Sequence, residues 1–122
     1  MAIRAERLAR ANRIAEAALD KKALDLVALD VSELTSYADT FVIVTATSDR
    51  HARAIADAIG EAESANGAKP LGIEGYGEAR WVLLDLGDVI VHVFQEKVRA
   101  TYDLERLWSD ARSIALSAAA TG

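Results

Sequence analysis

Two runs of hydrophobic residues near the C-terminal end of the chain predict a β-hairpin. The first covers residues 81–86 and the second residues 89–94, and each consists mainly of Val, Ile, Leu and aromatic side chains. Gly87 and Asp88 separate the runs, which is the length of a two-residue hairpin turn. Gly at the first turn position accepts a positive φ without steric cost, as a type II′ turn requires.

This turn fixes which hairpin side chains share a face, because strand residues alternate between the two sides of a sheet. One face is wholly aliphatic and should lie in the core; it consists of Val82, Leu84, Leu86, Val89, Val91 and Val93. The other face carries Trp81, Leu83, Asp85, Ile90, His92 and Phe94. A surface that mixes aromatic rings with a carboxylate and an imidazole is either covered by a helix or reserved for a partner.

The rest of the pattern predicts an α/β protein. Apolar residues recur at helical spacing over residues 4–22, 48–66 and 96–108, whereas residues 23–31, 40–47 and 70–74 have strand character. The run at 40–47 is nearly continuous and β-branched, as expected for a central strand buried on both faces. The order of elements predicts a single layered domain with a mixed five-stranded sheet flanked by helices. Strand, helix and strand over residues 40–74 should form a parallel unit.

Length and composition indicate one domain in a reducing compartment. The chain has 122 residues, no cysteine and no apolar run long enough to span a membrane. We expect a cytoplasmic protein whose domain covers residues 1–108. The Ala/Ser-rich segment 109–122 is expected to be a tail that extends the last helix.

The charge is unevenly distributed. The formal net charge is −5, with an excess of three positive charges in residues 1–22 and −8 in the remainder. An acidic body does not bind nucleic acid through bulk electrostatics and favours a basic protein partner instead. The positive excess includes Arg4, Arg7, Arg10 and Arg13, which we expect to form a solvated helix face; an RNA contact is the open alternative.

Two pairs of polar side chains are candidates for chemistry. Ser48 and His51 are close enough in sequence for a nucleophile and base, but their spacing is better explained by a helix N-cap. His92 lies diagonally across the hairpin from Asp85, so these two groups can form an acid–base pair or a structural or docking contact. Two distant histidines without cysteine do not supply a zinc site, and we expect no metal or cofactor.

The sequence resembles the ribosomal silencing factor family, also called Iojap-like. The resemblance rests on Leu-Gly-Ile-Glu-Gly at 71–75, on the hairpin run at 81–94 and on Tyr-Asp-Leu-Glu-Arg-Leu-Trp at 102–108. Residues 39–57 match as well. Ala46 departs from the pattern, since relatives commonly have Gly there, and the segment after Trp108 lies outside it.

This resemblance implies a function without catalysis. Members bind ribosomal protein L-fourteen on the large ribosomal subunit, block association with the small subunit and repress translation. Their fold looks like a nucleotidyltransferase core without the catalytic residues. The residues implied in partner binding are Trp81, Asp85, Leu86, Asp88 and His92, with Tyr102 and Glu74 beside them.

Two alternatives stay open at this point. The chain can instead be a nucleotidyltransferase-like enzyme that uses Asp85, Asp88 and His92. An exposed edge of the hairpin can also pair with a second copy, which would make the free protein a homodimer.

Overall fold

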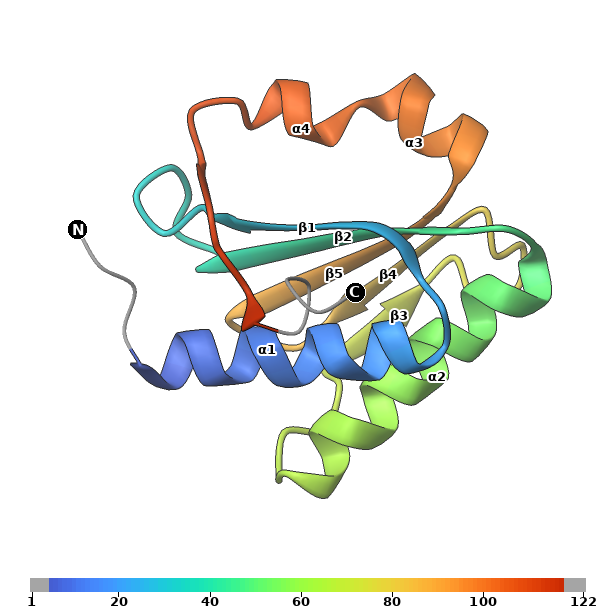
Figure 1. The fold of residues 1–122 in the computed structure, drawn as a ribbon, viewed down its shortest axis with the longest axis horizontal. Coiled ribbons are helices and arrows are strands. Elements are labelled where there is room, and N and C mark those ends of the chain that lie inside the picture. Colours follow the sequence, from blue (N-terminus) through green and yellow to red (C-terminus); the bar gives the residue numbers. More distant parts are fainter. Residues whose placement is uncertain (1–4, 118–122) are drawn as a thin grey trace.

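The computed structural model describes residues 5–117 and shows a three-layer α/β domain (Figure 1). In chain order the elements are α1 (Ala5–Asp20), β1 (Leu24–Asp30), β2 (Thr40–Ala46), α2 (Asp49–Ala65), β3 (Gly72–Glu74), β4 (Trp81–Asp85), β5 (Val89–Gln95), α3 (Glu96–Tyr102), α4 (Leu104–Leu107) and β6 (Arg112–Ser113). The strands form one mixed sheet in the order β3-β4-β5-β2-β1-β6. Helices α1 and α2 cover one side of it, and α3 and α4 cover the other. The predicted fold class is confirmed.

Strand β2 lies inside the sheet, as its β-branched sequence predicts. All seven of its residues are buried. It pairs in parallel with β5 and antiparallel with β1. Because β2 has strands on both edges and helices on both faces, it organises the whole core.

The predicted hairpin register is confirmed. Trp81 lies opposite Phe94, Leu83 opposite His92 and Asp85 opposite Ile90. The backbone N–H of Leu86 donates to the carbonyl of Val89 at 2.9 Å, which closes the two-residue turn. Gly87 has a φ of +87°, the conformation for which glycine was expected.

The two faces of the hairpin belong to different cores. The aliphatic face packs under α1 and α2 with Ile14, Ile55 and Ile59. The aromatic face packs under α3 and α4, where Phe41, Phe94 and Leu104 are buried together. The helices of this second layer contain only seven and four residues, so they are much shorter than α1 and α2 on the other face.

Several details differ from the sequence prediction because they depend on long-range pairing. The sheet has six strands rather than five, because Arg112 and Ser113 pair with Asp30 and Leu29 of β1. The segment expected to extend the last helix therefore returns to the sheet over its described part, and Leu116 beyond it is 5% exposed. The predicted helix over 96–108 is divided at Asp103, whose φ of +45° is left-handed.

The edges of the sheet also differ. Strands β2 and β3 run parallel, as predicted, but β4 and β5 lie between them. The hairpin edge that we considered for self-pairing is not exposed, because β3 covers β4 and β2 covers β5. The edge strands of the described sheet are β3 and β6.

Candidate functional site

Aromatic side chains lie at the surface where β4 begins, next to Tyr102, the last residue of the short helix α3. The Trp81 ring contacts Phe94 with a centroid distance of 4.8 Å and Tyr102 with one of 4.6 Å. Trp81 and Leu83 are half-buried, and Tyr102 is 55% exposed. We call Trp81, Leu83 and Tyr102 the aromatic surface. Leu83 was not among the predicted site residues, although it lies on the same strand face as Trp81, which was the signal for it.

A hydrogen bond from Trp81 to His92 holds this surface in place. The indole Nε1 donates to Nδ1 of His92 at 3.1 Å, so the imidazole proton must lie on Nε2. His92 is 5% exposed, and its Nε2 has no hydrogen-bond partner in the described part of the chain. Burial lowers the pKa of His92 from 6.5 to about 4. The ring is therefore neutral at physiological pH and serves as a support for Trp81.

The expected contact between Asp85 and His92 is not made. Asp85 Oδ1 accepts from the backbone N–H of Gly87 at 2.9 Å and stabilises the hairpin turn. His92 is instead enclosed by the rings of Phe41, Phe94 and Trp81. The acid–base alternative gains no support, because the carboxylate accepts from a backbone N–H two residues away.

The remaining predicted site residues fall into two groups. Asp88 and Glu74 are exposed, and Asp85 is half-buried, so these carboxylates can reach a partner. Leu86 is only 5% exposed and belongs to the core under α1 and α2. An anchoring role for the Leu86 and His92 side chains does not fit this burial, because the hairpin register turns Leu86 away from Trp81 and aromatic rings cover His92.

The N-terminal arginines are tied to the domain rather than solvated. Arg10 Nε and Arg13 Nε lie 2.7 and 2.9 Å from the two carboxylate oxygens of Glu63 on α2, whose side chain is fully buried. Arg10 also donates to the carbonyl of Leu86 at 2.7 Å, and Arg7 pairs with Asp39 at 3.4 Å. The expected solvated face is therefore wrong for these three residues. Arg4 lies outside the described residues.

Glu63 was missed in the sequence analysis, although a signal for it was present. It follows Ile59 by four positions, as Ile59 follows Ile55, so it lies on the apolar stripe of α2. A carboxylate on a core-facing stripe needs a cationic partner.

The Ser48 and His51 pair is structural, as expected from the cap pattern. Ser48 Oγ accepts from the backbone N–H of His51 at 3.0 Å, which caps α2. The imidazole bridges two further backbone groups, with Nδ1 accepting from Thr47 at 2.9 Å and Nε2 donating to the carbonyl of Lys21 at 2.6 Å. Both ring nitrogens are therefore engaged in holding α2 against the turn after α1.

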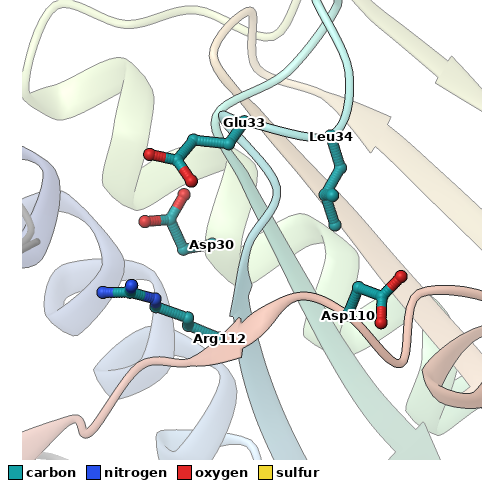
Figure 2. Close-up of a pocket in the computed structure, with 5 residues that line it drawn as sticks. All are labelled: Asp30, Glu33, Leu34, Asp110 and Arg112. Carbon is teal, nitrogen blue, oxygen red and sulfur yellow. The ribbon is translucent and has the colours of Figure 1, made fainter.

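A small acidic pocket lies at the opposite edge of the sheet. It has a volume of about 60 Å³ and is lined by Asp30, Glu33, Leu34, Asp110 and Arg112. Figure 2 shows Asp30 and Glu33 close together and Asp110 well apart from them. Burial opposes the ionisation of Asp30, but hydrogen bonds from Ser32 outweigh it and hold the pKa of this carboxyl below its usual range.

Residues 5–117 contain neither a clustered set of metal ligands nor a membrane-spanning helix. No group of three or more His, Asp or Glu side chains in this range is arranged to hold a metal ion. Among the same residues, no helix combines the length and hydrophobicity needed to cross a bilayer.

Comparisons with known proteins give a consistent result. The family model described as "Ribosomal silencing factor during starvation" matches residues 4–121. The ribosomal silencing factor of Bacillus subtilis is 48% identical over 100 residues, which cover 81% of this chain and 85% of that protein. The chloroplastic protein Iojap of Zea mays is 37% identical over 115 residues, which cover 92% of this chain and 49% of that protein.

Solved structures agree with the fold. A crystal structure from Chromobacterium violaceum superposes with a TM-score of 0.81 at 32% identity, covering 94% of this chain and 93% of that one. A second, from Bacillus halodurans, gives a TM-score of 0.76 at 39% identity, with coverage of 85% and 94%.

Proposed function

Since this chain belongs to the ribosomal silencing factor family, we propose that it binds ribosomal protein L-fourteen on the large ribosomal subunit and thereby blocks joining of the small subunit. Relatives that are 38 to 48% identical to it over the aligned residues carry the name of ribosomal silencing factor. The family is regulatory rather than catalytic. The proposed action is steric, takes place in the cytoplasm and represses translation without turnover.

The observation that carries this proposal is that the Trp81 side chain is only half-buried. Its indole packs against the buried rings of Phe94 and His92 and against the exposed ring of Tyr102. Large aromatic side chains at the centre of a surface are the residues that most often dominate protein–protein affinity. A fixed indole also loses little conformational freedom on binding, which favours a tight contact.

Acidic groups around the aromatic surface support a basic partner. Asp85 lies on the same strand face as Trp81, and Glu74 pairs across β3 and β4 with Leu83 on that face. Asp88 is exposed at the hairpin turn. Ion pairs at the rim of an interface contribute at most about 1 kcal/mol each. We therefore assign the affinity mainly to Trp81 and Tyr102, and the orientation of the partner to the carboxylates.

The nucleotidyltransferase alternative gains no support from the arrangement of its three residues. His92 Nδ1 is occupied by the indole, and Asp85 accepts from Gly87. Asp88 is exposed at the turn, where its backbone carbonyl accepts from Asp39 and Thr40. Transfer from labelled nucleotide in the presence of magnesium, lost in Asp85→Asn, would favour the enzyme.

A subunit-joining assay tests the proposed function. Isolated large and small ribosomal subunits are mixed with and without the protein and separated by sedimentation. We expect the protein to co-sediment with the large subunit and to reduce the peak of joined ribosomes. Undiminished joining at saturating protein would contradict the proposal.

A further inference from the structure

One of the two edges of the sheet is formed by β3. This strand is the first in the sheet order and pairs with β4 alone, so within the described residues no strand lies beside its outer edge. Gly72, Ile73 and Glu74 are all exposed. Leu71 just before them is 75% exposed and Ile73 is 49% exposed. Unpaired backbone groups on an exposed edge are a template for pairing with another chain.

A groove of about 490 Å³ runs between this edge and α2. Its apolar part consists of Ala56, Gly60, Pro70 and Ile73. Ile73 faces α2 because it lies opposite Leu84, which belongs to the core on that side. Gly60 has no side chain, so the groove stays open at this turn of the helix.

Carboxylates border the edge on both faces. Asp57 and Glu61 line the groove, where Lys69 is the one cation. On the opposite face, Glu74 lies at the end of β3, and Asp85 is the cross-strand neighbour of Gly72. A chain laid along β3 would therefore meet negative charge on both of its sides.

We propose that this edge receives an extended segment of the ribosomal partner, which pairs with β3 as an additional strand. The partner's residue beside Ile73 would be apolar and would enter the groove. Its two neighbours would point to the other face, where Lys or Arg side chains would meet Glu74 and Asp85. Addition of a strand to a sheet edge gives affinity through backbone hydrogen bonds and specificity through alternate side chains.

Charge argues for a basic partner rather than a second copy of this chain. If two copies paired through β3, the carboxylates beside β3 in each copy would lie in one interface. Juxtaposed like charges oppose association. A basic segment instead neutralises them. The inference rests on the proposed function, because it assigns the occupant to a protein of the large subunit.

Two variants with a matched control test the edge. Ile73→Asp places a charge in the groove, and Gly60→Gln adds a side chain on the α2 side, where a Cβ lies in van der Waals contact with Pro70 and Leu84. We expect each variant to weaken binding to isolated large subunits at least tenfold. Leu34→Asp is the control, because Leu34 is 44% exposed and lines the pocket bordered by β1 and β6 at the other edge; its affinity should stay within twofold of wild type. Thermal unfolding of each variant verifies that it is folded.

Amide hydrogen exchange supplies a readout independent of affinity. Peptides covering residues 71–75 should exchange at least tenfold more slowly when the large subunit is bound. The edge assignment would be overturned if both edge variants bound with wild-type affinity and the 71–75 amides stayed unprotected. Loss of binding in Trp81→Ala in the same experiment would leave the proposed function intact. Absence of wild-type binding would overturn the proposed function and this partner with it. Protection of 71–75 in a free dimer would assign the edge to a second copy and also overturn the inference.

Discussion

Trp81 Nε1 donates a hydrogen bond to His92 Nδ1 at 3.1 Å, from the first residue of β4 to the middle of β5. The bond fixes both the rotation of the indole and the tautomer of the imidazole. The buried imidazole thus positions the half-buried indole, so the exposed part of Trp81 depends on a residue that is itself buried.

Removal of the Trp81 side chain should strongly weaken the proposed docking. For Trp81→Ala we expect the affinity for the large subunit to fall about 30-fold or more. This corresponds to a loss of about 2 kcal/mol or more in binding free energy, as is typical when a hot-spot residue is truncated to alanine. Co-sedimentation over a range of protein concentrations measures it. Trp108→Ala is the control, because Trp108 is also half-buried but packs on Phe41 at 5.1 Å, away from Trp81. Wild-type affinity in Trp81→Ala would remove its anchoring role.

The stability of the protein should decrease in mild acid because of His92. Burial lowers the pKa of His92 to about 4 from 6.5, so the unfolded chain binds the proton more tightly than the folded one. The stabilisation is complete above about pH 6.5 and is lost as the pH falls to about 4, by roughly 3 kcal/mol in total. Urea unfolding at several pH values measures it. His92→Phe should show a smaller decrease over this window, and an equal decrease would contradict the assignment.

Neutralisation of Glu63 should destabilise the packing of α1 against α2. Glu63→Gln removes a fully buried carboxylate that pairs with both Arg10 and Arg13, so we expect a loss of about 3 kcal/mol in the free energy of unfolding. Glu61→Gln is the matched control, since Glu61 is exposed two residues earlier on the same helix, and its effect should stay within about 0.5 kcal/mol. Denaturant unfolding compares the two variants. Equal stabilities would show that the buried pairing does not hold α1.

The loop before β4 should tolerate alanine at one glycine and not at the other. Gly75 has a φ of +77°, and a Cβ there would lie 2.1 Å from the carbonyl oxygen of Trp81. Gly75→Ala should therefore cost more than about 2 kcal/mol and displace the start of β4. At Gly77 a Cβ meets nothing within 4 Å, so Gly77→Ala should change stability by less than about 0.5 kcal/mol. Thermal unfolding distinguishes the two; comparable melting temperatures would contradict the close approach.

The segment after α4 should contribute to stability. Leu116 is 5% exposed in the core under α1 and α2, so Leu116→Ala should cost about 2–4 kcal/mol. Leu107→Ala removes the same atoms from a side chain that is 73% exposed, and it should have little effect. Chemical denaturation of both variants tests this. Wild-type stability in Leu116→Ala would return this segment to the role of a tail.

The sequence by itself determined the features that depend on near neighbours. The two-residue turn at Gly87 and Asp88 set the hairpin register, and the register set which residues share a face with Trp81. The Ser48 cap placed the start of α2, and the β-branched run placed β2 inside the sheet. These features follow from backbone preference and side-chain alternation over a few residues, which a linear pattern contains in full.

Only the tertiary structure decided which polar groups meet. Glu63 pairs with Arg10 and Arg13 across 53 and 50 positions of the chain, and the strand at Arg112 returns to β1 from more than 80 positions away. Arg10 also donates to the backbone carbonyl of Leu86, which lies 76 positions further along the chain. Such contacts depend on how helices and strands pack in three dimensions, and the spacing of residues along the chain carries no measure of that packing.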